Sequence, residues 1–303
     1  MSGRPLMILA LVSLVFGCGS KEPYHREGGV WRFERSDLDV PKGEALTPLN
    51  RRFARSATRV WYRDSRITGA DPATFRPLDE HYARDAAHAW WADMYRDGRD
   101  YFTTERIRIR LLADADASAL KVLADGYATD GAHAYHEGQA FPVADAASFE
   151  PLANGFARDR VQGYHQRTPV AGSEGATFQV AAPHFAKDAR HVYYADLGVS
   201  HGGAPAVTLP GADPASFQAL DHDYARDARR AFFRGKALKA DLATFQVLDY
   251  GYARSSDAVF YYGEPVKGAD PATFTVLPPT QDSALGQDKA ATYRDGVRID
   301  RNG

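Results

Sequence analysis

The sequence predicts an all-β protein built as an array of short β-hairpin repeats. The heptad Gly-Ala-Asp-Pro-Ala-Thr-Phe at 69–75 returns unchanged at 268–274, and 211–217 differs from it at one position. A second motif, Tyr/Phe-Ala-Arg-Asp or a close variant, begins at Phe53, Tyr82, Tyr127, Phe156, Phe185, Tyr224 and Tyr252. A recurring period of about 28 residues identifies a repeat array. We therefore expect seven to eight units stacked as an open solenoid, with a closed, propeller-like ring of seven blades as the alternative.

Turn formers and aromatic runs predict the structure of each unit. In residues 224–248 the aromatic run 231–233 indicates a strand, and Gly235 indicates the turn before a return strand. Asp241 is then expected to cap a short helical turn, and residues 246–248 should form the next strand. Because strands usually have five to six residues, we expect about three per unit. The heptad phenylalanine should form a core row in every unit, made of Phe75, Phe149, Phe178, Phe217, Phe245 and Phe274, with Leu120 in the most divergent copy.

The regions outside the repeats have distinct predicted roles. The repeats should fill 50–280, with a spacer and N-terminal cap at 18–49 and a C-terminal capping half-repeat at 281–303, since repeat arrays need atypical terminal units. Residues 1–17 indicate a signal peptide. Their apolar run, 6–16, is too short to span a bilayer as a helix.

Cys18 is the only cysteine, so the chain can form neither an internal disulfide nor a cysteine-based zinc site. The tetrad Val15-Phe16-Gly17-Cys18 resembles the lipobox of bacterial lipoproteins. The resemblance implies cleavage after Gly17 and lipidation of Cys18, which makes the membrane an expected partner. Gly19 is not the aspartate associated with inner-membrane retention, so the resemblance implies the outer membrane, facing the periplasm. An ordinary secretory signal with a coincidental cysteine is the alternative.

The repeats also resemble a bacterial family. The stretch 187–194, the stretch 227–233 and the weaker Asp288-Lys289 with Tyr293 are similar to the motif after which the DKNYY family is named. The similarity extends over roughly 50–300. The resemblance implies a repeat fold and no catalytic residues.

Several functions are disfavoured by composition and motif spacing. Lys and Arg total 37 against 39 Asp and Glu, so no overall basic field would gather nucleic acid. Ser173 lies in a degenerate heptad and lacks the glycine two positions earlier that an esterase nucleophile turn uses. His133 and His136 have metal-ligand spacing, but on the expected strand they project from opposite faces. We expect no catalytic residue, metal or cofactor.

Two polar positions recur in the units. The motif aspartates are expected to bond to local backbone amides in turns rather than to bind calcium, because oxygen ligands are not clustered around them; they are Asp85, Asp130, Asp159, Asp188 and Asp227. The position three residues after the motif aspartate is polar in most units and includes His88, His133 and His191. These side chains are expected to form a solvated row along one edge or face, which we call the polar ladder. A pH-sensitive or ligand-contacting face is the alternative for that ladder.

A stripe of aromatic residues has two interpretations. It comprises Trp61, Trp90, Tyr135, Tyr164, Tyr193, Phe232 and Phe260. The stripe is expected to form a second core layer. Alternatively, Trp61, Trp90, Tyr135 and Tyr193 would belong to a platform that binds sugar rings or an extended peptide, since stacked units create long binding surfaces.

An insertion in the copy that begins at Tyr82 carries a separate strand pattern. Arg106, Arg108 and Arg110 alternate with Ile107 and Ile109, which predicts a half-buried strand with the arginines side by side on one face. Guanidinium groups there would bind carboxylates or phosphates. The alternative is that they only protect an exposed strand edge from pairing with another chain.

Together these features predict a non-enzymatic, lipid-anchored cell-envelope protein that presents a β-repeat surface to another protein or to a cell-wall polymer such as peptidoglycan. The alternative is an envelope enzyme acting on glycan, with carboxylates drawn from several repeats. A glycosidase would need two carboxyl groups about 5–10 Å apart across a cleft.

Replacing Cys18 by alanine should move the protein from the membrane fraction to soluble or unprocessed forms, because the lipid is the only anchor that the sequence indicates. Fractionation and immunoblotting measure the change, and Ser20→Ala, two residues away, should leave the protein in membranes. A Cys18→Ala protein that is cleaved and still membrane-bound would contradict lipidation.

Overall fold

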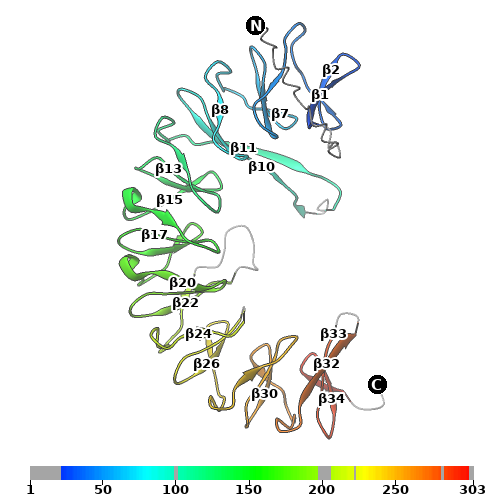
Figure 1. Cartoon of the computed structure of the whole chain (residues 1–303), viewed down its shortest axis with the longest axis vertical. Coiled ribbons are helices and arrows are strands. Elements are labelled where there is room, and N and C mark those ends of the chain that lie inside the picture. Colours follow the sequence, from blue (N-terminus) through cyan, green and yellow to red (C-terminus); the bar gives the residue numbers. More distant parts are fainter. Residues whose placement is uncertain (1–21, 99–101, 197–205, 222, 281–282, 300–303) are drawn as a thin grey trace, which may run out of the picture.

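The computed structural model describes residues 22–98, 102–196, 206–221, 223–280 and 283–299. Their strands form nine small antiparallel sheets, numbered here 1 to 9 along the chain. The sheets follow one another in an open arc whose two ends lie apart (Figure 1). The predicted all-β open array is therefore confirmed, and the alternative of a closed seven-bladed ring is wrong. Among the described residues, no helix has the length and hydropathy of a membrane span.

The strands are short throughout the array. Sheets 1 to 3 contain β1 (Tyr24–Glu27), β2 (Val30–Phe33) and β3 (Ser36–Asp37); β4 (Thr47–Pro48), β5 (Phe53–Arg55), β6 (Val60–Tyr62) and β7 (Ser65–Arg66); and β8 (Arg76–Pro77), β9 (Tyr82–Arg84), β10 (Ala89–Tyr95) and β11 (Arg106–Leu111). Sheets 4 to 6 contain β12 (Lys121–Val122), β13 (Tyr127–Thr129), β14 (Ala134–His136) and β15 (Gln139–Phe141); β16 (Glu150–Pro151), β17 (Phe156–Arg158), β18 (Gly163–His165) and β19 (Thr168–Pro169); and β20 (Gln179–Ala182), β21 (Phe185–Lys187), β22 (Val192–Tyr194) and β23 (Val207–Thr208). Sheets 7 to 9 contain β24 (Gln218–Ala219), β25 (Tyr224–Arg226), β26 (Ala231–Phe233) and β27 (Lys236–Leu238); β28 (Gln246–Val247), β29 (Tyr252–Arg254), β30 (Val259–Tyr261) and β31 (Glu264–Pro265); and β32 (Thr275–Thr280), β33 (Ser283–Gln287), β34 (Thr292–Arg294) and β35 (Val297–Ile299).

Sheets 2 to 9 each have four strands, so the expected three per unit is wrong. In sheets 2 to 8, the Tyr/Phe-Ala-Arg-Asp motif forms the second strand. The aromatic run forms the third strand, and the return segment after the next turn forms the fourth. The first strand directly follows the heptad phenylalanine and has only two residues in most sheets, as in β28. Four strands fit into about 28 residues because most are only two or three residues long, about half the usual length.

The C-terminal cap is also larger than expected. Sheet 9 is a complete four-stranded sheet that begins with β32, so the predicted boundary between 280 and 281 falls inside it. The half-repeat interpretation is therefore wrong. The complete unit was not recognised because β33, its second strand, lacks the Tyr/Phe-Ala-Arg-Asp motif.

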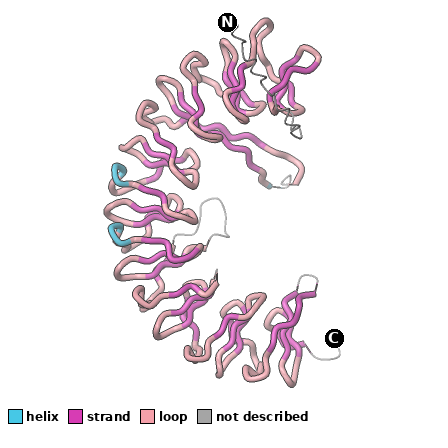
Figure 2. Tube along the Cα trace, in the orientation of Figure 1, coloured by secondary structure: helices cyan, strands magenta, loops and turns pink. Residues whose placement is uncertain are grey.

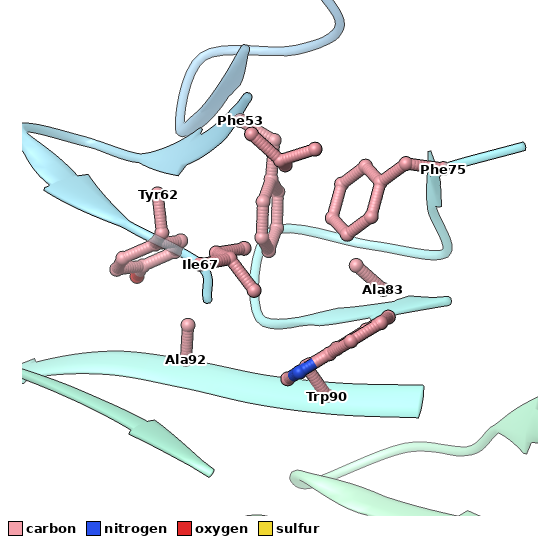
Figure 3. Packing of buried hydrophobic residues seen from close by; sticks show 8 residues of the cluster. Phe53, Tyr62, Ile67, Phe75, Ala83, Trp90 and Ala92 are labelled. Atoms are coloured by element: carbon pink, nitrogen blue, oxygen red, sulfur yellow. The ribbon is translucent and has the colours of Figure 1, made fainter. Parts of the chain in front are cut away.

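Apolar clusters lie between consecutive sheets, and eight of them join the nine sheets. Figure 3 shows the cluster between sheets 2 and 3, in which the heptad residue Phe75 packs near Phe53 and Trp90. Every member of the predicted core row is at most 8% exposed, which confirms the row: Phe75, Leu120, Phe149, Phe178, Phe217, Phe245 and Phe274. Burying apolar area between neighbours stabilises sheets that are too small to fold alone.

The two ends of the strands lie on opposite sides of the arc. The 3₁₀ turns Ala146–Ser148 and Gly175–Thr177, which belong to the linkers between sheets, lie on the convex side (Figure 2). The hairpin of β10 and β11 extends to the concave side (Figure 1). Since strands alternate in direction, the turn between the second and third strands lies on the convex side with the linkers. The turns after the first and third strands lie on the concave side.

Candidate functional site

The aromatic stripe is buried, so it is not a platform for ligands. Trp61, Trp90, Tyr135 and Tyr193 are at most 3% exposed. Each lies in the cluster shared with the preceding sheet. The platform interpretation of these four residues is wrong because sheets pack against both faces of the third strand. The stripe is the second core layer that the sequence also predicted.

The motif aspartate links two segments of the fold, as Asp188 illustrates. Its Oδ1 accepts bonds from the amides of Arg190 and His191, both at 2.7 Å. Its Oδ2 accepts the amide of Glu174 in the preceding linker at 2.9 Å and the hydroxyl of Tyr193 at 2.6 Å. The local bonds confirm the predicted turn role. The bond to the linker, fourteen residues earlier, was not predicted.

The same link recurs along the arc. The pairs of aspartate and linker amide are Asp85 with Asp71, Asp130 with Asp116, Asp159 with Asp145, Asp227 with Asp213 and Asp288 with Asp270. In sheet 8, Asp257 takes this position through the amide of Asp241 at 3.1 Å. We call this bond the linker staple. Burial alone would raise the pKa of Asp130, but bonds from His133 and from backbone amides outweigh it and lower the pKa to about 2.

The heptad completes the staple. Asp71 accepts the amide of Ala73 at 3.0 Å and the hydroxyl of Thr74 at 2.7 Å. The Thr74 oxygen in turn accepts the amide of Ala86, in the turn after the next motif, at 3.1 Å. Asp241 makes equivalent bonds and accepts the amide of Ala243, so the predicted capping is confirmed, but the segment it caps is a turn rather than a helix.

The motif arginine links the unit to the linker that follows it. Arg84 donates to the carbonyl of Ala117 at 2.7 Å, and Arg158 and Arg254 donate to Phe178 and Phe274, both at 3.0 Å. The motif arginine therefore binds the following linker, and the adjacent motif aspartate binds the preceding linker. This arrangement assigns both residues a structural role.

Tyrosine hydroxyls hold the concave turns through hydrogen bonds to backbone groups, as the motif arginines hold the linkers. Tyr224 donates to the carbonyl of Gly251 at 3.0 Å and accepts the amide of Gly263 at 2.9 Å, so one hydroxyl joins two turns of the next sheet. Tyr82 makes the same pair of bonds, to Gly126 and Gly138. The concave turns are thus anchored to the core of the preceding sheet.

The arginine hairpin has the predicted faces. Ile107 and Ile109 pack against the cluster between sheets 2 and 3. Arg108 lies on the other face, 5.3 Å from the Trp91 ring centre and 4.8 Å from that of Tyr95. Sheet order places β11 at the edge of sheet 3, so the edge-protecting interpretation stays open.

The three arginines differ in their partners. Arg106 forms an ion pair with Asp97 at 3.4 Å, and Arg108 forms one with Asp93 at 3.3 Å. Arg110 instead lies 5.4 Å from the Trp91 ring centre and donates to the carbonyl of Glu137 at 3.2 Å. Burial and the positive charges of Arg108 and Arg167 lower its pKa. The negative charges of Glu137 and Asp93 act in the opposite direction on the same pKa.

A hollow of about 340 Å³ adjoins the hairpin on the concave side. Its walls include Trp91, His81 and four carboxylates, namely Asp79, Asp93, Asp125 and Glu137. Arg52 donates to Nε2 of His81 at 3.2 Å, so Nδ1 is the ring nitrogen that donates to the carbonyl of Ala92 at 2.9 Å. The hollow could not be predicted from the sequence, because its residues come from different turns.

The remaining candidates have structural roles. Ser173 donates to the carbonyl of Val170 at 2.6 Å and accepts the amide of Gly163 at 2.8 Å. His133 is exposed near Asp130, whereas His136 is buried against Tyr127 with ring centres 4.4 Å apart. His88, His133 and His191 are exposed, as expected of a solvated ladder. In the part of the chain that the structure describes, no three His, Cys, Asp or Glu side chains are placed to hold a metal ion. Cys18 lies outside the described residues.

Replacing Asp130 by asparagine should destabilise the protein at pH 7 by about 1–3 kcal/mol, because the amide group cannot accept bonds on both sides. The native pKa of about 2 lies below the usual value near 3.9. The stabilisation is therefore complete above pH 4 and is lost as the pH falls toward 2. Urea unfolding at both pH values measures this effect. An equal difference between wild type and variant at pH 7 and pH 2 would contradict the charged staple.

The comparisons with known proteins agree with these motifs. Residues 156–297 match the model of the DKNYY family, and no curated protein or solved structure matches the chain. The matched segment contains the buried pair Asp188 and Tyr193, whose counterparts in sheet 9 are Asp288 and Tyr293, 2.9 Å apart. The match thus supports the membership of the DKNYY family that the motif residues predicted.

Proposed function

We propose that this chain is a non-enzymatic, lipid-anchored protein of the cell envelope that binds a partner on the concave side of its arc. The lipobox-like sequence ending at Cys18 supports the anchor, on the outer membrane facing the periplasm. The partner is a protein or a cell-wall polymer that carries carboxylate or phosphate groups.

The single observation that carries this proposal is the position of the arginine hairpin. The β10–β11 hairpin extends to the concave side, where no other described sheet has so long a hairpin (Figure 1). It places Arg110 near Arg167, a residue of the turn between β18 and β19 two sheets further along. The charge of Arg167 reaches Arg110, as do those of Glu137 and Asp93, but within the described part of the chain no carboxylate forms an ion pair with Arg110.

The chemistry of these groups favours an anionic partner. A guanidinium presents several donors in a plane and binds carboxylates and phosphates through paired bonds. The Trp91 ring supports Arg108 and Arg110 from one side, which restricts their motion. Such charges at a binding surface raise the association rate and make it sensitive to salt.

An enzyme acting on glycan is the second candidate, and the hollow beside the hairpin favours it. Asp125 and Glu137 are exposed there and come from different turns of sheet 4. The other two carboxylates already have partners in the protein: Asp79 accepts the backbone amide of His81, and Asp93 forms an ion pair with Arg108. An enzyme would release soluble sugar from peptidoglycan, whereas a binding protein would only attach to it.

Replacing both Arg110 and Arg167 by serine should reduce co-sedimentation with purified peptidoglycan sacculi about tenfold at low salt, because the carboxylates of the polymer lose their cationic site. Wild-type binding should itself weaken between about 50 and 300 mM NaCl, since salt screens exposed charges.

Arg160→Ser is the matched control for charge. Its side chain is 77% exposed in the convex turn between β17 and β18, and the substitution should leave sedimentation unchanged. Normal sedimentation of the double variant would contradict the site, and aggregation with normal sedimentation would mean that the arginines only protect an edge. Release of soluble sugar by wild type would favour the enzyme.

A further inference from the structure

Sheet 8 is unusual in its concave turns. Tyr250 and Tyr262 have left-handed backbone conformations, with φ of 55° and 46°. Their side chains remain 49% and 48% exposed. At the corresponding turn positions, sheets 1, 2, 4, 5, 7 and 9 have polar residues with positive φ, namely Glu34, Arg63, Asp125, Glu137, Asn154, Gln166, Arg234 and Asp295. Bulky residues rarely adopt this conformation, and such strain concentrates at functional sites.

The two tyrosines belong to one rigid structure. The amide of Tyr262 donates to the carbonyl of Gly251 at 2.8 Å, and the Tyr224 hydroxyl bonds the same carbonyl. The Tyr262 ring covers Gly251, since a Cβ there would lie 2.8 Å from the ring. Tyr250 is the neighbour of that glycine. Edge contacts with Phe233 and Tyr261, at 6.1 and 4.6 Å between ring centres, hold the Tyr262 ring from other sides.

A groove of about 730 Å³ begins at Tyr250 and follows β28. Its polar walls include the exposed Asp221 and Asp249, together with Gln246 and Arg254. Arg254 already donates to Phe274 and Gln246. One oxygen of Asp221 also accepts the amides of Asp223 and Tyr224. The other oxygen of Asp221 and the carboxylate of Asp249 are therefore the acceptors that the groove offers to a ligand, and both charges would repel an anion.

We propose that Tyr250 and Tyr262, with this groove, bind a neutral glycan through its pyranose rings. A pyranose ring has apolar C–H faces that suit exposed phenol rings, and rim hydroxyls that donate to carboxylates. Rigid aromatic side chains lose little entropy on binding. An extended peptide strand fits less well, because β28 offers an edge of only two residues. The proposal rests on the proposed function by naming a glycan as the cell-wall ligand, but it uses a different sheet from the arginine hairpin.

The test is titration calorimetry of the full chain in detergent with the β-1,4-linked tetramer of N-acetylglucosamine. Wild type should bind with a Kd below about 1 mM. Replacing Tyr250 by Asn and Tyr262 by Gln should weaken binding at least about tenfold while the thermal midpoint is kept. The fold tolerates these residues, because Asn154 and Gln166 hold the same positions in sheet 5 at φ of 59° and 54°. Phenylalanine at both positions retains the rings and should retain binding.

Two controls separate this site from the hairpin. The Arg110→Ser, Arg167→Ser protein should bind the neutral tetramer like wild type, even if it no longer sediments with sacculi. Absence of wild-type binding, or equal binding by the Asn/Gln variant, would overturn the glycan site. Loss of tetramer binding in the arginine variant would assign the sugar to the hairpin, and this result would also overturn the glycan site at Tyr250 and Tyr262.

Discussion

The linker staple, in which an aspartate of a convex turn accepts a backbone amide from the preceding linker, is the contact on which this array depends. Strands of two or three residues cannot form a stable sheet alone. Each sheet must therefore be fixed to its neighbours. Oδ1 of Asp188 organises one convex turn, while its Oδ2 holds the linker and the Tyr193 hydroxyl. Charge-assisted bonds of this kind are stronger than neutral ones.

The other conserved positions of the repeat act with the staple. The neighbouring arginine reaches the following linker, as Arg158 reaches Phe178. The heptad threonine connects its own linker to the next convex turn, as Thr74 does with Ala86. The heptad phenylalanine fills the cluster between sheets. The motif arginine and aspartate and the heptad residues therefore serve the convex side and the core. The motif tyrosine, as in Tyr82 and Tyr224, bonds to glycines of the concave turns, whose other residues are free to differ between sheets.

That division explains why the two candidate sites are concave. The arginine hairpin belongs to sheet 3 and the exposed tyrosines to sheet 8, and neither occurs in the other described units. Loops on a rigid scaffold commonly carry binding residues, and stacked repeats offer an extended surface for them. Tyrosine hydroxyls from preceding sheets, such as that of Tyr224, fix these turns in place.

Much of the fold could be predicted from periodicity, and much of the site could not. The heptad spacing predicted the array and the buried phenylalanines. The strand after the heptad phenylalanine was predicted in 246–248, where β28 lies, but the motif strands such as β25 were not, because three residues are too few to show an alternating pattern. The bonds of Asp188 to its own turn were predicted because their partners are only two and three residues away. Its bond to the linker was missed because that partner lies fourteen residues earlier. The aromatic stripe left two interpretations open because periodicity does not say that both faces of a strand are covered. Tyr250 and Tyr262 were not identified, since their importance lies in a backbone conformation and exposure that the sequence does not display.

The most direct test of this account is hydrogen exchange at the Asp213 amide, which lies in a linker and bonds to Oδ2 of Asp227 at 2.9 Å. The account predicts protection close to that of strand amides in wild type. In Asp227→Ala this protection should be lost, together with that of the Arg229 and Arg230 amides, which bond to Oδ1 of the same carboxylate. The Asp71 amide, which is bonded to Asp85 in a distant unit, serves as the internal control. Free exchange of the Asp213 amide in wild type, or unchanged protection in the variant, would contradict the staple.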